Sequence, residues 1–237
     1  MKGVLMKGFD IDTISTLQWI DHVDDLPVLQ SLLHFADQKT IKKGAYLSRQ
    51  GQASDAFYYL SKGQVKVQLV TAEGKEKTLW YTLAGNILND VSFFHHHPTN
   101  ASIIANEDCE VYEFNRVTFQ EIIKKHPELA EEMLTSMSKR IRVLVHQLET
   151  SAYLKPITNV CRLLYPFSEK YGKKLGNETH IHLELTHTEI ASMTSLHRVT
   201  VTKVLSQLEK EGVLDCSNRF DICIKAPEKL RIYAAYE

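Results

Sequence analysis

Residues 186–208 read THTEIASMTSLHRVTVTKVLSQL, and no other segment of the chain predicts its structure so specifically. It opens with a capping box, because the Thr186 hydroxyl and the Glu189 carboxylate can satisfy free amides at the start of a helix. The pattern predicts a short helix over 188–193, then a tight connection and a second helix over 197–211 that ends before a glycine.

The residues that follow this helix pair predict a β-hairpin. Segments 213–216 and 220–224 have strand character, and a polar turn separates them. The helix pair can bury a small core made of Ile190, Ala191, Val201, Val204, Leu205 and Leu208. Two helices, a tight turn and a β-wing together are typical of a winged helix-turn-helix.

Polar side chains cluster in the first turns of the second helix, the end of a recognition helix that enters the DNA major groove. Arg198 can bind guanine O6 and N7 or a phosphate, Thr200 and Lys203 can bind phosphates, and Val199 can contact a thymine methyl. An isolated charged helix would more simply be a solvated surface, but the adjoining elements favour DNA binding. The candidate DNA-binding residues are Thr188, Ser195, His197, Arg198, Val199, Thr200, Thr202 and Lys203.

The charge balance limits how this segment can bind nucleic acid. The 237-residue chain has a net charge of −1, and residues 156–237 hold 11 Lys and Arg against 10 Asp and Glu. DNA-binding domains are usually more basic. We therefore expect one copy to bind weakly, and two copies to engage two half-sites together.

The N-terminal half has the pattern of an antiparallel β-roll. From about residue 25 to 114, short β-type runs alternate with glycines at intervals of 7 to 12 residues, as in a sandwich or barrel. Residues 64–70 alternate polar with apolar, and the turn at 72–75 leads into a second strand. The whole chain is thus expected to be α+β, with this roll as an effector-sensing domain over residues 1–126.

A long helix is predicted to follow Pro127, since proline is favoured in the first turn of a helix. Residues 127–155 are expected to form a dimerisation helix that ends in a hinge at 151–155. A DNA-binding domain is expected at 156–237. A narrow apolar seam of this kind suits a contact between two helices of a homodimer, although packing on its own domain is the alternative. The seam residues, at intervals of 4, 4, 3 and 4, are Met133, Met137, Ile141, Leu144 and Leu148.

Composition excludes several other classes. No apolar run approaches the roughly 20 residues of a membrane span, and no signal-peptide pattern opens the chain, so we expect a cytoplasmic protein. The four cysteines, at 109, 161, 216 and 223, lack paired spacing and are interpreted as reduced packing residues. We expect no metal and no cofactor.

These features resemble the CRP/FNR family of bacterial regulators over nearly all of residues 25–225. The resemblance rests on residues 41–44, 51–67 and 185–208, and residues 198–203 match the family's Arg-Glu-Thr-Val-Ser-Arg recognition motif. It implies an allosteric homodimer on a palindromic DNA site, with RNA polymerase as a further partner. The chain departs from this motif at Val199, where the family has glutamate. Valine cannot accept a hydrogen bond from cytosine as glutamate does. We therefore expect an A·T-rich half-site.

The sensing region departs from the cyclic-nucleotide-binding members of that family. Those members carry Gly-Glu and then an arginine, whereas this chain has Asn89-Asp90 and Thr99. An anionic cyclic phosphate would be buried here without a guanidinium partner, which is costly. Cyclic AMP is therefore not the expected effector. A classical cyclic-nucleotide response remains the alternative.

A closer similarity rests on Glu76-Lys77, Trp80-Tyr81, Gly85-Asn86, Lys155-Pro156 and Arg162-Leu163-Leu164-Tyr165. In these residues the chain resembles the halophenol-sensing regulators of reductive dehalogenation. It suggests that the effector is a halogenated phenol or another small aromatic or organic anion, whose charge Arg140 would pair. Trp80 and Tyr81 are as readily explained as strand core. The candidate effector-binding residues are Trp80, Tyr81, Asn89, Asp90 and Arg140.

Other functions are less favoured. The run at 95–97 invites a haem or metal interpretation, but three consecutive histidines rarely converge on one ion. A zinc site near His180 and His182 is possible, although capping and wing packing explain these histidines. A metal-dependent β-roll enzyme would need histidines on facing strands, and residues 40–90 contain none. A cyclic-nucleotide module that regulates a partner enzyme would leave the winged domain unexplained.

Overall fold

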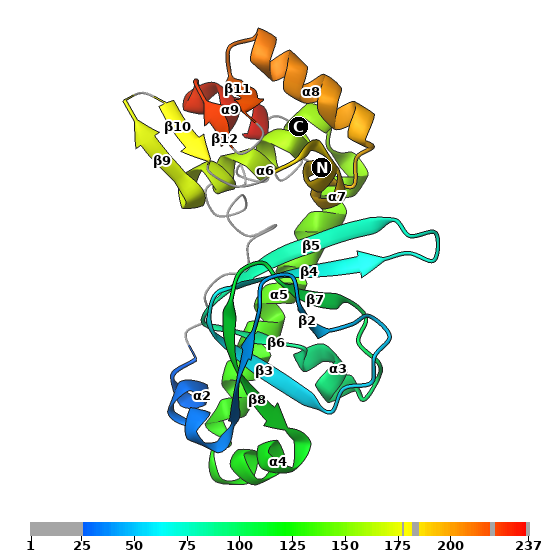
Figure 1. Ribbon diagram of the computed structural model, residues 1–237, viewed down its shortest axis with the longest axis vertical. Coiled ribbons are helices and arrows are strands. Elements are labelled where there is room, and N and C mark those ends of the chain that lie inside the picture. The colour runs from blue at the N-terminus through cyan, green and yellow to red at the C-terminus, as the bar shows by residue number, and fades with distance from the viewer. Residues whose placement is uncertain (1–25, 177, 182–184, 219–220, 236–237) are drawn as a thin grey trace, which may run out of the picture. The chain divides into compact units, whose positions relative to one another are not determined.

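The glycine-punctuated N-terminal half folds into a β-roll (Figure 1). The computed structural model describes residues 26–176, 178–181, 185–218 and 221–235. Two antiparallel four-stranded sheets, ordered β1-β8-β3-β6 and β2-β7-β4-β5, make up the roll. Their strands are β1 (Asp37–Ile41), β2 (Tyr46–Ser48), β3 (Ala56–Lys62), β4 (Gln64–Val70), β5 (Glu76–Leu83), β6 (Asn86–Leu88), β7 (Ser102–Ala105) and β8 (Cys109–Asn115). The predicted antiparallel roll is confirmed.

Glycines occupy the sharp turns of the roll. Gly63 joins β3 to β4 with a φ of 90°, a conformation that side chains disfavour. A Cβ atom there would also lie 2.7 Å from the carbonyl oxygen of Asp108. The glycines whose spacing predicted the turns all have positive φ; they are Gly44, Gly51, Gly63, Gly74 and Gly85.

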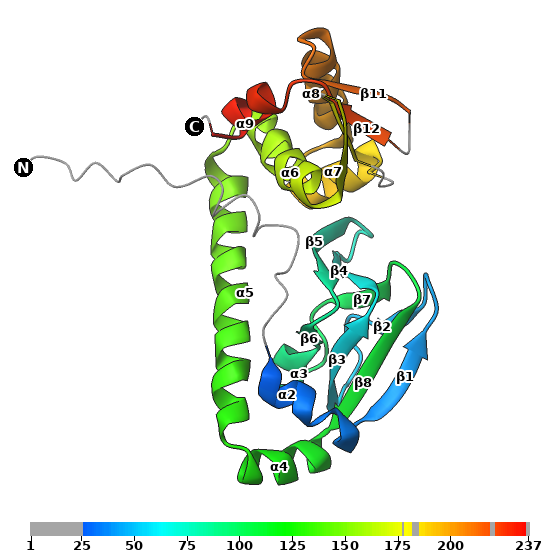
Figure 2. The ribbon, with the colours of Figure 1, turned by 90° about the vertical axis from the view of Figure 1, so that its left-hand side faces the viewer.

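One hydrophobic core joins the β1-β8-β3-β6 sheet to residues of the helices that lie beside it in Figure 2. Phe57 of β3 stacks on Phe114 of β8 with ring centroids 5.0 Å apart. The helices are α2 (Pro27–Ser31), a 3-10 turn η1 (Leu33–Phe35), α3 (Asp90–His95), α4 (Arg116–Lys125) and α5 (Glu128–Tyr153). The fully buried core side chains include Leu26, Leu29, Phe57, Ile87, Phe93, Phe114 and Leu129.

Helix α5 is attached to the roll by more than apolar contacts. The Glu132 carboxylate accepts hydrogen bonds from the backbone N–H groups of Val28 (2.7 Å) and Leu29 (3.0 Å). These N–H groups belong to the first turn of α2, where a helix has no internal acceptors for them. Glu132 therefore caps α2 from more than 100 residues away in sequence, which no local pattern reveals.

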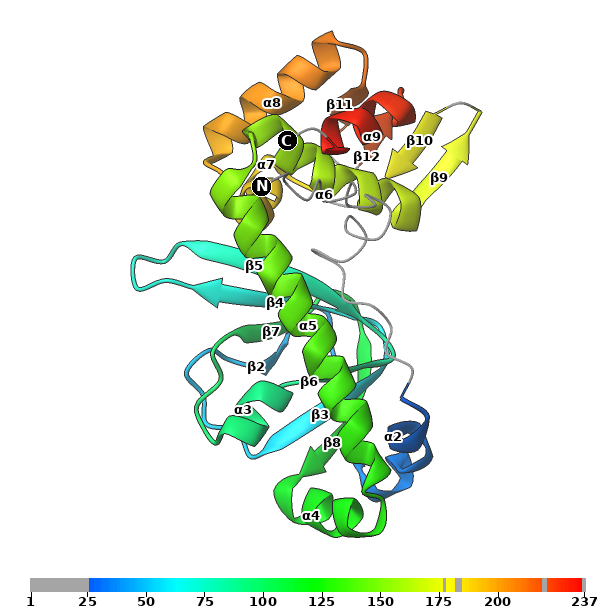
Figure 3. The ribbon, with the colours of Figure 1, turned by 180° about the vertical axis from the view of Figure 1, so that it is seen from behind.

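The C-terminal half is a helix-turn-helix with a small sheet (Figure 3). Helix α6 packs against α7, α8 and α9, and the antiparallel sheet has the order β11-β12-β10-β9. The elements are α6 (Pro156–Tyr171), β9 (Gly172–Leu175), β10 (Glu178–Ile181), α7 (His187–Thr194), α8 (Arg198–Lys210), β11 (Leu214–Asn218), β12 (Asp221–Ile224) and α9 (Pro227–Ala235).

Strand β10 ends at Ile181, and residues 182–184, which include His182, lie outside the described residues. The predicted end of the long helix shifts. Helix α5 continues to Tyr153, so the break expected at 151–155 is confined to the two residues before Pro156. Proline explains its position, because it disfavours the helical conformation of the preceding residue.

The described residues form two compact units that divide at the Val143–Leu144 bond. This bond lies inside α5, so the long helix contributes residues to both units. Among the described residues, no helix is both long and apolar enough to cross a bilayer.

Candidate DNA-binding surface and effector site

The predicted helix-turn-helix is present, and its first helix starts at the capping box. The N–H of Glu189 donates to Oγ1 of Thr186 at 3.2 Å, and the N–H of Thr186 donates to a Glu189 carboxylate oxygen at 3.1 Å. Ser195 ends α7 with a φ of 58°, in the left-handed region, and His197 precedes α8. Each helix is therefore within a residue or so of its predicted bounds.

The small core that holds α7 against α8 is also as predicted. Deep burial of one face of α8 leaves the opposite face to solvent. The six predicted core residues are all less than 9% exposed: Ile190, Ala191, Val201, Val204, Leu205 and Leu208.

The residues predicted to contact DNA point away from this core. Val199 is notable, since a large apolar side chain at 55% exposure has no packing role in the single chain. Thr200 is half-buried. The other seven are exposed: Thr188, Ser195, His197, Arg198, Val199, Thr202 and Lys203. They lie at the start of α7, in the turn and in the first turns of α8.

Two hydrogen bonds that the sequence analysis missed fix the helices to one another. Nδ1 of His187 lies 2.9 Å from Oγ1 of Thr202, which also donates to the Arg198 carbonyl at 3.1 Å. The buried Asn159 of α6 donates from Nδ2 to the carbonyl of Thr194 at 2.9 Å. A polar amide among the apolar residues of α6 was the signal for the second bond.

The predicted wing is the hairpin of β11 and β12. The strands pair antiparallel, with Leu214 opposite Ile224 and Asp215 opposite Cys223. Lys225 and Asp215 form an ion pair of 2.9 Å beside them. Residues 219 and 220, at the hairpin tip, lie outside the described residues.

In the roll, two of the predicted effector residues meet. Nη1 of Arg140, on α5, lies 2.6 Å from Oδ1 of Asp90, and Nη2 donates to Oγ of Ser136 at 3.0 Å. The Asp90 side chain is 2% exposed and that of Arg140 is 12% exposed. A buried charge requires such a partner, because an isolated one would be costly to desolvate. The pair also ties α3 to α5.

The neighbouring positions are structural. Asn89 has a φ of 63°, and its Nδ2 donates to Oγ of Ser54 at 2.7 Å and to the Ala56 carbonyl at 2.8 Å. Thr99, at the position where the resemblance expects arginine, is buried, and its hydroxyl donates to the Arg49 carbonyl. The carboxamide of Asn89 and the hydroxyl of Thr99 are thus both engaged within the roll.

Trp80 and Tyr81 lie on opposite faces of β5. Trp80 pairs with Val67, a residue of the apolar interior, and packs against that interior itself. Tyr81 pairs with Lys66 and is only 7% exposed. Because successive strand residues point in opposite directions, the two rings do not line one site. Only Trp80 is retained as a candidate.

The predicted dimer seam needs one correction. Met133 is 4% exposed, because it packs in the roll core with residues of α2 and α4. The neighbouring Leu134 is 64% exposed instead. Met137 is half-buried. The large apolar side chains that α5 leaves exposed, hereafter the α5 stripe, are Leu134, Ile141, Leu144, Val145 and Leu148.

All four cysteines are free thiols. Burial is the main cause that raises the pKa of Cys161 and Cys216 to about 12 and that of Cys223 to about 11. Burial also raises the pKa of Cys109. These thiols are therefore protonated near neutral pH, unlike the thiolates of reactive cysteines.

Comparison with known proteins identifies both halves. The cyclic nucleotide-binding domain family matches residues 38–126, and the Crp-like helix-turn-helix domain family matches residues 159–233. This chain is a transcription regulator of the CRP/FNR family. The sequence-based prediction of an effector-binding domain followed by a DNA-binding helix-turn-helix is confirmed.

Proteins similar to this CRP/FNR regulator are described with different small molecules. The cAMP-activated global transcriptional regulator CRP of Salmonella typhimurium is 23% identical over 87% of this chain and 93% of its own length. CprK complexed with OCPA has a TM-score of 0.70 at 20% identity, covering 92% of this chain and 97% of CprK. The c-di-GMP responsive regulator CLP of Xanthomonas campestris has a TM-score of 0.75 at 18% identity, covering 84% and 99%. The two structures share the fold with this regulator.

Proposed function

We propose that this regulator binds a palindromic, A·T-rich DNA site as a homodimer, and that a small effector beside Asp90 and Arg140 controls its affinity. One observation carries the proposal: one apolar face of α8 is buried, while Arg198, Val199 and Lys203 project outward from its first turns. In this orientation the N-terminal end of α8 is free to enter a major groove.

The roles of these side chains follow from their chemistry. Arg198 offers two parallel N–H donors to guanine or one phosphate, and Lys203 a single cation to a phosphate. The half-buried Thr200 can donate to a phosphate, and the exposed Val199 offers only an apolar contact to a thymine methyl. Thr188, Ser195 and His197, beside them, suit the sugar-phosphate backbone.

The homodimer supplies the affinity that one nearly neutral domain lacks. The α5 stripe exposes large apolar residues along one helix, including Leu148 at 71% and Ile141 at 60%. Burying a matching stripe of a second copy would remove this surface from water. Linking two helix-turn-helix domains turns the second DNA contact into an intramolecular event.

The effector is proposed to be a small aromatic or organic anion, such as a halogenated phenol. Arg140 has five N–H donors, so its guanidinium can hold Asp90, Ser136 and an anionic effector together. Trp80, on the interior face of β5, would contact the aromatic ring. CprK, which is complexed with OCPA, supports this class.

A cyclic nucleotide is the second candidate effector, since residues 38–126 match the cyclic nucleotide-binding domain family. Asp90 could accept from a ribose hydroxyl. The buried Thr99, however, offers no charge to a cyclic phosphate.

Control would pass along α5, because Arg140 and the α5 stripe belong to the same helix. An effector that prefers one arrangement of the paired helices would shift the population of dimers toward it. The functional division is then a sensing domain at 1–126, a dimerisation helix and hinge at 127–155, and a DNA-binding domain at 156–237. Such a regulator would act in the cytoplasm, with RNA polymerase as a further partner.

The test begins with selection of binding sites from random duplex DNA, followed by fluorescence anisotropy on the selected duplex. Arg198→Ala should weaken specific binding about 5- to 150-fold, the equivalent of one bidentate base contact. Lys203→Ala should weaken binding to all duplexes alike. It should also lower the slope of log affinity against log salt concentration by about one. The control is Lys210→Ala, in the last turn of α8. Equal binding to every duplex would refute sequence-specific recognition.

The effector is tested on the same duplex with a panel of halophenols, cyclic AMP and cyclic di-GMP. A halophenol should change DNA affinity in the wild-type chain and lose this effect in Arg140→Met. The matched control is Arg142→Ala, an exposed cation on the same helix. A response to a cyclic nucleotide alone would replace the proposed effector class with the second candidate.

A further inference from the structure

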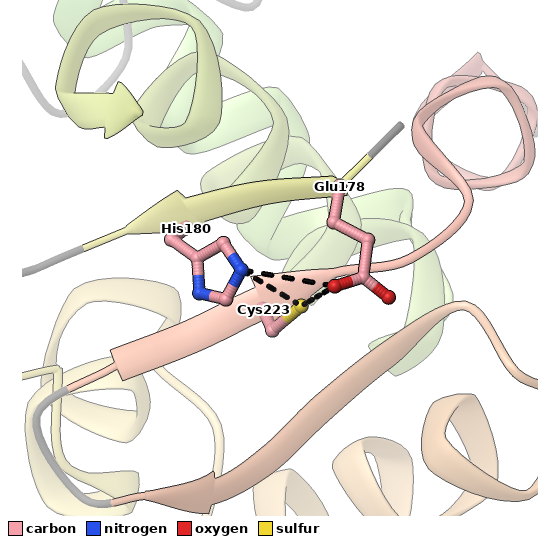
Figure 4. A group of neighbouring side chains, drawn as sticks. All are labelled: Glu178, His180 and Cys223. Atoms are coloured by element: carbon pink, nitrogen blue, oxygen red, sulfur yellow. Dashed lines mark hydrogen bonds and ion pairs between the residues drawn. The ribbon is translucent and has the colours of Figure 1, made fainter. Parts of the chain in front are cut away.

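Three side chains with metal-binding atoms converge on the small sheet of the DNA-binding domain (Figure 4). Oε2 of Glu178 lies 3.5 Å from Sγ of Cys223, and Nε2 of His180 lies 3.7 Å from each of these two atoms. His180 and Glu178 are half-buried and Cys223 is buried.

The strand register explains this convergence. His180 of β10 lies directly opposite Cys223 of β12. Residues two apart on a strand share a face, so Glu178 joins His180, and Asp221 joins Cys223, on one side of the ladder. The four side chains therefore form a compact block across two hydrogen-bonded strands, which is a rigid base for a site.

The separations between the three atoms match those of a tetrahedral zinc site. Zinc binds sulfur at about 2.3 Å and nitrogen or oxygen at about 2.0–2.2 Å. Tetrahedral angles then place any two ligand atoms roughly 3.3–3.6 Å apart. The distances of 3.5, 3.7 and 3.7 Å are within a few tenths of an ångström of these values.

Asp221 orients the histidine. Its Oδ2 lies 2.8 Å from Nδ1 of His180, whereas the other ring nitrogen, Nε2, faces Cys223 and Glu178. The carboxylate accepts a hydrogen bond from the N–H at Nδ1. The lone pair of the histidine is then on Nε2, which faces the other two groups. Histidines that bind metals almost always have such a partner.

We propose that Glu178, His180 and Cys223 bind a divalent transition-metal ion, zinc by preference, and that Asp221 is the positioning residue of His180. A sulfur, nitrogen and oxygen donor set favours zinc over magnesium or calcium, which take oxygen ligands. The ion displaces the proton of the Cys223 thiol, and the resulting thiolate and the Glu178 carboxylate neutralise its charge. A fourth position stays open to water or another ligand.

A bound ion would act on the sheet that includes the wing hairpin. The ion would cross-link β10 to β12, the strand that also pairs with β11 in the wing hairpin. It would stabilise this sheet without using any residue proposed to contact DNA. The metal site therefore stands independently of the proposed effector and of the proposed base contacts.

The test uses the full chain without an affinity tag, first stripped with a chelator. Zinc competition against a chromophoric chelator should give one ion per chain. Cobalt should give the d–d absorption of tetrahedral Co²⁺ and a thiolate-to-cobalt charge-transfer band. Cys223→Ser should abolish that band, and Cys216→Ser, on the neighbouring strand, should retain it. Asp221→Asn should weaken zinc binding about 10- to 100-fold.

The absence of a charge-transfer band, or its persistence in Cys223→Ser, would overturn the proposal. Binding by the exposed run His95–His97 would give no thiolate band, which separates that source of metal affinity from this site. If Cys223→Ser does not fold, Glu178→Gln serves instead, since the Glu178 side chain is 46% exposed. This variant should keep the fold and lose zinc affinity, and unchanged affinity would count against the site.

Discussion

Nδ1 of His187 in α7 and Oγ1 of Thr202 in α8 lie 2.9 Å apart, so the two helices of the helix-turn-helix share a hydrogen bond at the surface proposed to contact DNA. Thr202 also donates to the carbonyl of Arg198, one turn earlier. Its oxygen is then left to accept from the imidazole N–H. Thr202 thus positions the helices and has no free proton to give to a phosphate.

This arrangement predicts that His187→Ala and Thr202→Val weaken DNA binding by similar amounts. The expected loss is about 0.5–1.5 kcal/mol, the net value of one hydrogen bond, or roughly 2- to 12-fold in affinity. The double variant should bind like either single variant, because both remove the same bond. Anisotropy measurements on all three variants test this. Additive losses would mean that Thr202 and His187 contact DNA separately.

The exposed Val199 predicts a specific change of base preference. Val199→Glu introduces an acceptor that can bind the N4 amino group of cytosine and removes the proposed contact with a thymine methyl. The preferred pair at that position should change from T·A to C·G, with about 1–3 kcal/mol of discrimination. Parallel site selection with both proteins measures it. A wild-type selection that already returns G·C would contradict the role given to Val199.

The features that sequence alone predicted are the local ones. The capping box at Thr186 and Glu189 joins residues three apart, and the glycine turns depend on single residues, so each leaves its full signal in a short window. The core of α8 follows from helical periodicity, since Val201, Val204, Leu205 and Leu208 define one face.

The features that sequence missed depend on long-range packing. The seam of α5 has apolar residues on two faces, and periodicity does not tell which face the roll covers; the burial of Met133 and exposure of Leu134 decide it. Cys223 and His180 are 43 residues apart, and only the register of β10 on β12 brings them together. A β-bulge in β5, beside Trp80, likewise changes which side chains face inward.

The α5 stripe predicts that dimerisation and folding stability depend on different residues of α5. Ile141→Glu and Leu148→Glu place charges where the second helix would pack, so they should give folded monomers in sedimentation experiments. Ile232→Glu, at an exposed apolar position on α9, is the control and should leave the dimer intact. Met133→Ala should lower the free energy of unfolding by about 2–5 kcal/mol without changing association. A Leu148→Glu dimer of unchanged affinity would move the interface elsewhere.

The buried pair of Asp90 and Arg140 predicts a non-additive stability effect. Arg140→Met leaves a carboxylate that is 2% exposed without its cation, which should destabilise the chain by about 3–5 kcal/mol. Adding Asp90→Leu removes the orphaned charge and should restore most of this loss. Urea unfolding of the two single variants and the double variant gives the coupling. Equal stability of Arg140→Met and the wild type would mean that the pair is not buried in solution.

Lys77 predicts how stability changes at alkaline pH. Burial lowers the pKa of Lys77 from 10.5 to about 8 in the folded chain. Between these two values the unfolded chain binds the proton and the folded chain has lost it, so stability rises with pH in this window. Below pH 8 the charged ammonium is held in a desolvated position, which opposes folding.

Lys77→Met should therefore have a higher Tm than the wild type near pH 7, and the difference should shrink between about pH 8 and 10.5. Lys75→Met, at an exposed position in the adjoining turn, controls for the loss of one charge. Thermal unfolding across this pH range measures both, and a Lys77→Met difference independent of pH would show that Lys77 titrates normally.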